Sequence, residues 1–158
     1  MNFFSTYLGK LTSTFFISMV PVIELRGAIP SGIAMGLDAW TVAILAIIGN
    51  MLPIPFIILF IRKIFAWMRT KNRWFNSIVT KMEAKADKHK DKIIKYEFWG
   101  LCLLVAIPLP GTGGWTGALV AAMLDMRLKN AIPAIFLGIV IAAVVVSLVS
   151  SGVLLLFF

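Results

Sequence analysis

Two charged side chains of opposite sign, Glu24 and Arg26, lie in a stretch that is otherwise apolar and rich in helix breakers, MVPVIELRGAIPSGIAMG (residues 19–36). A charge at the centre of a bilayer costs about 2.5 kcal/mol or more, so a charged residue at that depth predicts a functional site. Interrupted helices at membrane depth occur where protein or a water-filled cavity satisfies the backbone. We interpret Glu24 and Arg26, with Gly27 and Pro30, as a candidate substrate or ion site. The alternative is a buried ion pair that fixes the fold.

A second cluster of helix breakers, PLPGTGG (residues 108–114), interrupts another apolar stretch. Proline and glycine in this number cannot form a regular helix. The glycines allow a substrate to approach the backbone closely, and a threonine adds a hydroxyl group. Asn50 is a further polar residue in apolar sequence, and it either lines the same cavity as Glu24 or forms a hydrogen bond between helices. These residues complete the candidate site: Asn50, Pro108, Pro110, Gly111, Thr112 and Gly113.

The chemistry available to these residues favours transport. Glu24 is the acid that we expect at membrane depth, and a carboxylate that exchanges a proton can couple proton movement to substrate movement. Arg26 keeps its charge when buried and would repel cationic substrates. His89 lies in a lysine-rich run and Cys102 stands alone in apolar sequence, so we expect no metal site, no cofactor and no disulfide. A hydroxyl nucleophile such as Thr112 would lack a suitable base, so we expect no enzyme. A structural or assembly role is the remaining alternative.

The composition indicates an integral membrane protein. Hydrophobic residues make up 60% of the 158-residue chain, against roughly 45–50% in average soluble proteins, and the mean hydropathy is +0.96. We expect one membrane domain over residues 1–158. The first 20 residues contain no basic segment followed by a small-residue cleavage site, so we expect no cleaved signal peptide.

The net charge of +8 is concentrated in one segment. Residues 62–97 contain 11 of the 15 basic residues and 4 of the 7 acidic ones, which leaves a charge of +7 there. The positive-inside rule explains this bias, so we place residues 62–97 in the cytoplasm and expect no nucleic acid partner. Apolar residues recur there on one helical face, which predicts an amphipathic helix on membrane lipids: Ile64, Met68, Phe75, Ile78 and Met82.

The lengths of the apolar segments predict two re-entrant hairpins and two spans. Each half-segment has ten residues, or about 15 Å of helix, which reaches the middle of a bilayer about 30 Å thick. The four half-segments are Leu11–Val20, Ala28–Leu37, Phe98–Ile107 and Trp115–Leu124. Two uncharged stretches, residues 40–61 and 131–158, are long enough to cross the membrane.

The two halves of the chain, residues 1–61 and 98–158, correspond as an internal repeat. Pro21 precedes Asp38 by 17 residues, and Pro108 precedes Asp125 by the same number. This alignment pairs Gly27 with Gly114 and, after two extra residues, Gly49 with Gly138. One span per half requires the second half to be inverted, so the expected fold is an all-α inverted repeat of re-entrant hairpin plus transmembrane helix, with the cytoplasmic amphipathic helix between the halves. An alternative with four full spans places Arg127 and Lys129 outside, against the positive-inside rule.

Three motifs, ELRGAIPSGIAMG, GNMLPIP and AIPLPGTGGWTGALVAAML, resemble the small multidrug export protein family of bacteria and archaea. That family is similar to the DedA/VTT superfamily, whose members carry two opposed re-entrant hairpins and are linked to proton-dependent transport, lipid-phosphate flipping and lipid scrambling. The resemblance points to Glu24 and Arg26 in the first hairpin and to residues 108 and 110–113 in the second. DedA proteins typically carry arginines in the second motif, and this chain has none there.

The resemblance implies a small transporter or lipid flippase in the plasma membrane of a prokaryote. We expect it to use protons as the coupling ion, and its substrate could be an anionic lipid. The alternative is a proton-coupled small multidrug exporter. Four short membrane elements enclose little volume, so we expect a homodimer surrounded by membrane lipids.

Overall fold

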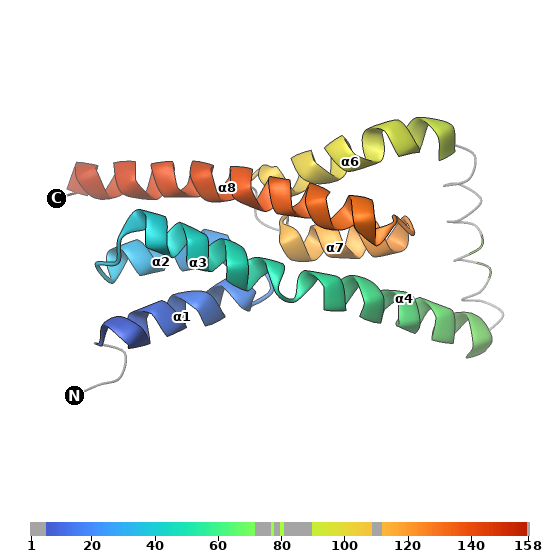
Figure 1. Cartoon of the computed structure of the whole chain (residues 1–158), viewed down its shortest axis with the longest axis horizontal. Helices are drawn as coiled ribbons and strands as arrows, with labels where there is room; N and C mark the ends of the chain where they lie inside the picture. The colour runs from blue at the N-terminus through green and yellow to red at the C-terminus, as the bar shows by residue number, and fades with distance from the viewer. Residues whose placement is uncertain (1–5, 72–76, 78–79, 81–89, 109–111, 158) are drawn as a thin grey trace.

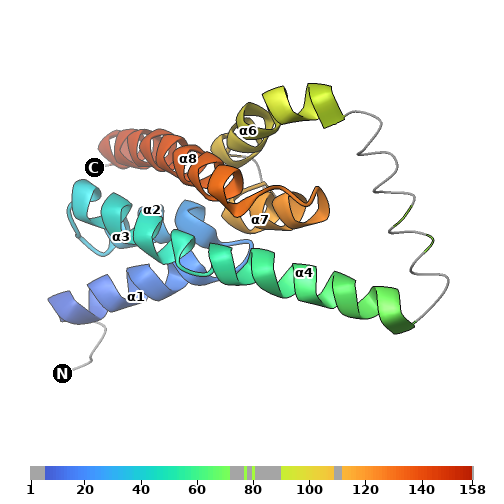
Figure 2. The same cartoon turned by 45° about the vertical axis from the view of Figure 1, so that its right-hand side comes forward.

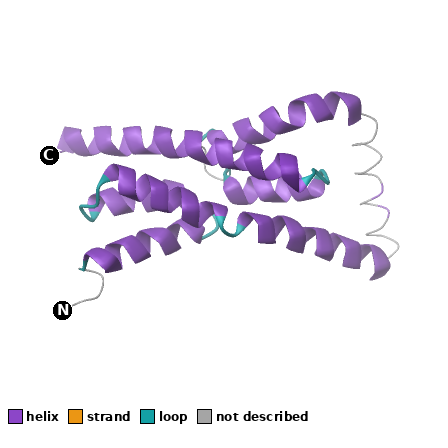
Figure 3. Ribbon diagram, in the orientation of Figure 1, coloured by secondary structure: helices purple, strands orange, loops and turns teal. Residues whose placement is uncertain are grey.

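The regular structure of the chain is helical throughout the described residues, 6–71, 77, 80, 90–108 and 112–157 of the computed structural model. Figure 3 draws these residues as helices joined by short loops, with no strand among them. The prediction of an all-α fold is therefore confirmed for this part of the chain. The helices are α1 (Tyr7–Met19), α2 (Glu24–Ala34), α3 (Ala39–Met51), α4 (Ile54–Lys71), α6 (Lys90–Ala106), α7 (Gly114–Met123) and α8 (Leu128–Phe157).

Helices α1 and α2 form a hairpin, in which they lie side by side and run in opposite directions (Figures 1 and 2). Lys10, near the start of α1, donates a hydrogen bond of 2.6 Å to the carbonyl of Met35, the C-cap of α2. The break between them covers residues 20–23. The break is shorter than the predicted one, residues 21–27, because α2 already begins at Glu24 and includes Gly27.

Helices α6 and α7 form the second hairpin, at the other end of the molecule (Figure 1). Helix α6 ends at Ala106 and α7 begins at Gly114, and residues 109–111 between them lie outside the described residues. A basic side chain again binds the chain after the returning helix, because Arg62 of α4 donates to the carbonyl of Met126 and lies 3.5 Å from the carboxylate of Asp125. Each hairpin is therefore held by a cation at the end opposite its tip.

The two predicted spans are both present as long apolar helices. Ala39–Ile64 has 26 residues and Leu128–Gly152 has 25, and each is long and apolar enough to cross a membrane. The first consists of α3 and α4 in one line with a turn at Leu52–Pro53, since proline cannot continue the hydrogen bonding of α3. Helix α4 runs on to Lys71, and most of the predicted amphipathic helix lies outside the described residues.

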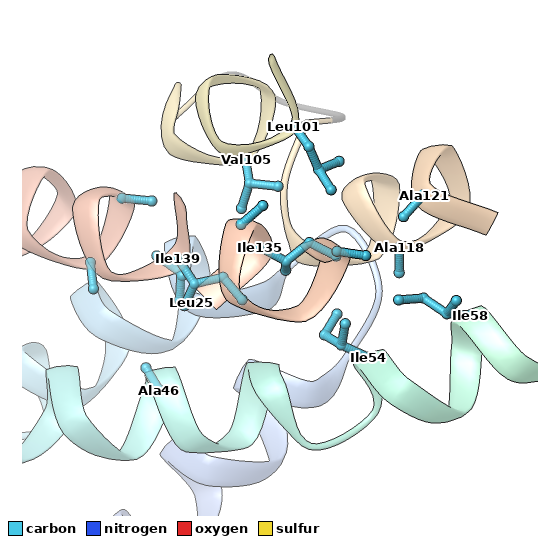
Figure 4. Packing of buried hydrophobic residues seen from close by; sticks show 14 of the residues in the cluster. Leu25, Ala46, Ile54, Ile58, Leu101, Val105, Ala118, Ala121, Ile135 and Ile139 are labelled. Atoms are coloured by element: carbon cyan, nitrogen blue, oxygen red, sulfur yellow. The ribbon is translucent and has the colours of Figure 1, made fainter. Parts of the chain in front are cut away.

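The short helices α2 and α7 lie at the centre of the packing. Helix α2 packs on α1, α3 and α8, and α7 packs on α4, α6 and α8. Figure 4 shows branched side chains of α4, such as Ile54 and Ile58, next to small residues of α7, such as Ala118, and all three are fully buried. Large apolar side chains also cover the outside of the long helices, for example Phe56 and Leu148, which are 69% and 70% exposed. An apolar exterior of this kind is typical of a membrane protein.

Two glycines allow pairs of neighbouring helices to cross closely. A Cβ atom on Gly49 of α3 would lie 2.8 Å from the carbonyl oxygen of Phe15 in α1, and one on Gly138 of α8 would lie 2.7 Å from the carbonyl oxygen of Cys102 in α6. Neither position has room for a larger residue unless the backbones move apart. Helix α1 of the first hairpin therefore crosses α3 at a glycine, and α6 of the second hairpin crosses α8 at a glycine.

Candidate functional site

The carboxylate of Glu24 caps a helix that lies 90 residues further along the chain. Glu24 is the first residue of α2 and is only 4% exposed. Its two oxygens accept hydrogen bonds from the backbone amides of Gly114, at 3.3 Å, and Trp115, at 3.0 Å. These are the first two residues of α7, whose amides have no partner inside their own helix. The N-terminal end of a helix also carries a partial positive charge, so it stabilises the carboxylate.

Gly113 makes this contact sterically possible. It is the N-cap of α7 and has φ +153° and ψ −167°, a conformation that is essentially restricted to glycine. A Cβ atom at this position would lie 2.8 Å from the carboxylate carbon of Glu24. In this structure the group that approaches the backbone at Gly113 is the carboxylate of Glu24, and the approach of a substrate there stays a prediction.

The backbone before Glu24 is strained. Val22 has φ +75° and Glu24 has φ +50°, although neither is glycine, and such conformations cost of order 1 kcal/mol or more each. The amide of Glu24 donates to the carbonyl of Val20 at 2.9 Å, which closes the turn. This turn places the carboxylate at the tip of the first hairpin, facing α7.

Arg26 binds the other side of the second hairpin tip. Its Nη2 donates to the carbonyl oxygen of Ile107 at 2.9 Å and to Oγ1 of Thr112 at 3.0 Å. Thr112 in turn donates to the same carbonyl at 2.8 Å. Ile107 directly follows α6, where carbonyl groups carry a partial negative charge. The acid and the base of α2 therefore contact helix ends of the opposite sign, and the structure brings Glu24, Arg26, Thr112 and Gly113 together.

Asn50 faces the same end of α7. It lies in the last turn of α3 and is fully buried. A Cβ atom on Gly114 would lie 2.9 Å from Oδ1 of Asn50. Neither Oδ1 nor Nδ2 of Asn50 has a hydrogen-bond partner among the described residues. Asn50 therefore lies beside the helix end that Glu24 contacts, while its two predicted roles stay predictions.

The remaining predicted residues are less directly placed. Gly27 lies against the side chain of Ile23, and Pro30 lies further along α2, beyond Arg26. Pro108 is exposed just after α6. Pro110 and Gly111 lie outside the described residues. In the described part of the chain, no group of three or more histidine, cysteine, aspartate or glutamate side chains could hold a metal ion.

Sequence reasoning missed three backbone groups of the site: the amides of Gly114 and Trp115 and the carbonyl of Ile107. Backbone groups are identical in every residue, so composition cannot single them out. A usable signal was present, because a glycine-rich break followed by an apolar helix places free amides at a helix start, which favours a negative group.

Three comparisons with known proteins bear on the identity of this chain. Residues 24–145 match the family model described as "Putative small multi-drug export protein". The matched range begins at Glu24 and contains all the residues of the candidate site. Neither the curated proteins nor the solved structures contain a match to this chain. The relation to the DedA/VTT superfamily therefore stays a prediction.

Proposed function

Since this chain belongs to the small multidrug export protein family, we propose that it is a membrane exporter whose transport site lies where the tips of its two hairpins meet. One observation carries this proposal: the charges of α2 are bound by the ends of α6 and α7. We propose transport rather than catalysis because the candidate nucleophile of the site, the hydroxyl of Thr112, donates to the carbonyl of Ile107 and the carboxylate of Glu24 accepts from α7.

We propose that both hairpins are re-entrant. Helices α1, α2 and α7 contain 13, 11 and 10 residues, or about 15–20 Å each, which is too short for a bilayer about 30 Å thick. Lys10 and Arg62 bind the two hairpins away from their tips, where charged groups would reach the two membrane surfaces. The tips would then meet near the midplane.

An inverted repeat is supported by the glycine crossings. Gly49 approaches Phe15 and Ser18, and Gly138 approaches Cys102 and Val105; the two contacted pairs are separated by the same 87 positions (102 − 15 and 105 − 18). The starts of α2 and α7, however, pair Glu24 with Gly114. The offset of 87 is also the one that pairs Gly27 with Gly114, so α2 begins three residues before the position that corresponds to the start of α7.

We propose protons as the coupling ion. An ionised carboxylate accepts hydrogen bonds at both oxygens, whereas a protonated one also carries a hydroxyl donor that would face an amide donor of α7. Protonation of Glu24 would therefore weaken the link between the hairpins and favour a change of state. Arg26 favours an anionic lipid as the substrate over a cationic drug, because a neighbouring cation repels cations.

We further propose a homodimer in the plasma membrane of a prokaryote, with residues 62–97 in the cytoplasm. The small volume that one copy encloses supports the homodimer. The positive-inside rule supports the cytoplasmic position of residues 62–97.

Reconstituted vesicles test the proposed function. A fluorescent phosphatidic acid in one leaflet reports lipid movement, ethidium in the lumen reports drug export, and an internal dye reports pH. We expect the wild-type protein to move the lipid faster when a pH gradient is imposed, and Glu24→Gln to lose this dependence. Glu97→Gln, which changes an acid of α6 away from the site, serves as the control. Export of ethidium without lipid movement would show that the substrate is a cationic drug and not an anionic lipid. If neither ethidium nor the lipid moved, the proposed transport function would be contradicted.

A further inference from the structure

The N-terminal end of α7 has the geometry of an anion-binding site. The buried side chain of Asn50 lies next to it and has no hydrogen-bond partner among the described residues. We propose that this helix end binds an anionic group of the transported molecule, and that Glu24, a carboxylate of the same chain, competes with that group for the site. The proposal rests on the proposed transport function. The carboxylate of Glu24 and a carboxylate or phosphate of the substrate would occupy the site in turn.

The contacts of Glu24 show that the site holds an anion. Two amides of α7 donate to the carboxylate of Glu24 at 3.0 and 3.3 Å, and Glu24 is only 4% exposed to solvent. Helix N-termini bind carboxylates and phosphates in the same way when these belong to a ligand. Glycine at positions 113 and 114 removes the side chains that would keep a ligand from the amides.

Asn50 is the second observation, and it is independent of the helix end. This side chain is fully buried, its oxygen faces Gly114, and neither polar atom of its amide has a partner among the described residues. Glu24 satisfies the amides of α7 but leaves Asn50 unsatisfied. A phosphate has more acceptor oxygens than a carboxylate, so a larger anion could accept hydrogen bonds both from α7 and from Nδ2 of Asn50.

The chemical class of the ligand follows from these donors. Two backbone N–H groups of α7 converge on the site, the side-chain amide of Asn50 lies beside them with Oδ1 nearest Gly114, and the guanidinium of Arg26 lies on the same hairpin tip. Donors and a cation select an oxyanion and disfavour a cationic ligand. The shared chemistry is a carboxylate or phosphate, either on a lipid headgroup or on a free anion.

The experiment removes the competitor and offers a small substitute. The full-length protein in detergent micelles carries Glu24→Ala, and its melting temperature is measured as sodium formate replaces sodium chloride at constant ionic strength. Glu97→Ala, wild type and Glu24→Gln are measured in parallel, the last because its side chain still fills the site. We expect formate to stabilise Glu24→Ala at concentrations at least tenfold below those that affect the other three proteins. Adding Asn50→Ala should weaken this formate effect at least threefold.

An equal effect of formate on all four proteins, or no effect on Glu24→Ala, would overturn the proposal. If Glu24→Ala unfolds in chloride, it is purified in formate; a fold that persists only in formate supports the site, and unfolding in both salts overturns it. Titrations with inorganic phosphate and with phosphatidic acid, against phosphatidylcholine, distinguish a free anion from a lipid headgroup. Binding is measured without transport, so retained formate binding with failed vesicle transport would reject the proposed function alone.

Discussion

Oε1 of Glu24 accepts a hydrogen bond of 3.0 Å from the backbone amide of Trp115, a residue 91 positions away. Glu24 also stands at the start of its own helix, α2. The starts of two helices, both with partial positive charge, therefore face each other through one carboxylate. A single side chain therefore joins the starts of a helix in each hairpin.

The first prediction concerns Glu24 itself. Glu24→Gln keeps one acceptor but turns an amide donor toward an amide of α7, so we expect the free energy of unfolding to fall by about 1–3 kcal/mol. The protein should remain folded, and its transport should no longer depend on a pH gradient. Thermal unfolding in detergent and vesicle transport measure the two effects.

The second prediction tests whether Glu24 and Arg26 have a role in transport or only stabilise the fold. Arg26 binds Ile107 and Thr112 through Nη2 of a rigid guanidinium that stays charged, whereas lysine is flexible and can lose its proton when buried, so Arg26→Lys should reduce transport. A buried charged pair that only supports the fold is often replaceable by apolar residues. The double variant Glu24→Met/Arg26→Met is therefore informative: normal stability together with normal transport would show that both residues are structural.

The third prediction concerns Gly113, which places the carboxylate of Glu24 close to the backbone of α7. Alanine at this position would collide with the carboxylate and would need an unfavourable φ, so Gly113→Ala should destabilise the protein by about 2 kcal/mol or more. Gly100→Ala is the matched control. Nothing lies within 4 Å of its added Cβ, and alanine favours the helix by roughly 0.5–1 kcal/mol. Equal melting temperatures for the two variants would contradict the described contact.

The fourth prediction concerns the glycine crossings. Gly49→Ala and Gly138→Ala should each lower stability by about 1–3 kcal/mol, because each added methyl group would meet a backbone carbonyl of α1 or α6. Gly152→Ala, which meets nothing within 4 Å, should be neutral or slightly stabilising. A large effect at only one of the two crossings would weaken the case for a structural repeat.

The fifth prediction concerns the topology. In a Cys102→Ser background, single cysteines replace Trp40 and Lys129, which are exposed at the starts of α3 and α8. If both hairpins are re-entrant, the cysteine at position 40 should react with an impermeant reagent from outside the cell and the one at position 129 only from the cytoplasm. Reaction of both from outside would favour four full spans.

Much of the fold could be predicted because its signals are local. Hydropathy over 20 residues shows where a helix is long and apolar enough to cross a membrane, and both such stretches are present. Proline and glycine remove backbone donors or favour other conformations, so the breaks at residues 20–23 and 107–113 fall near the predicted tips. Glu24 and Arg26 stood out because charges are costly in apolar surroundings.

The boundaries of the first tip could not be read in the same way. Gly27 and Pro30 have low intrinsic preference for a helix, yet both lie inside α2. Packing of α2 against α1, α3 and α8 outweighs that preference. The actual turn uses Val22 and Glu24 at positive φ, which no residue type in this stretch predicts.

The sequence by itself determined that this protein is a helical membrane protein with interrupted segments and with an acid and a base among them, because hydropathy, helix breaking and charge are properties of side chains. Only the tertiary structure decided what these side chains bind. Glu24 binds two amides of α7 and Arg26 binds a carbonyl after α6. Every residue except proline carries the same backbone groups. Which of them remain free at a helix end and face α2 depends on how distant helices pack.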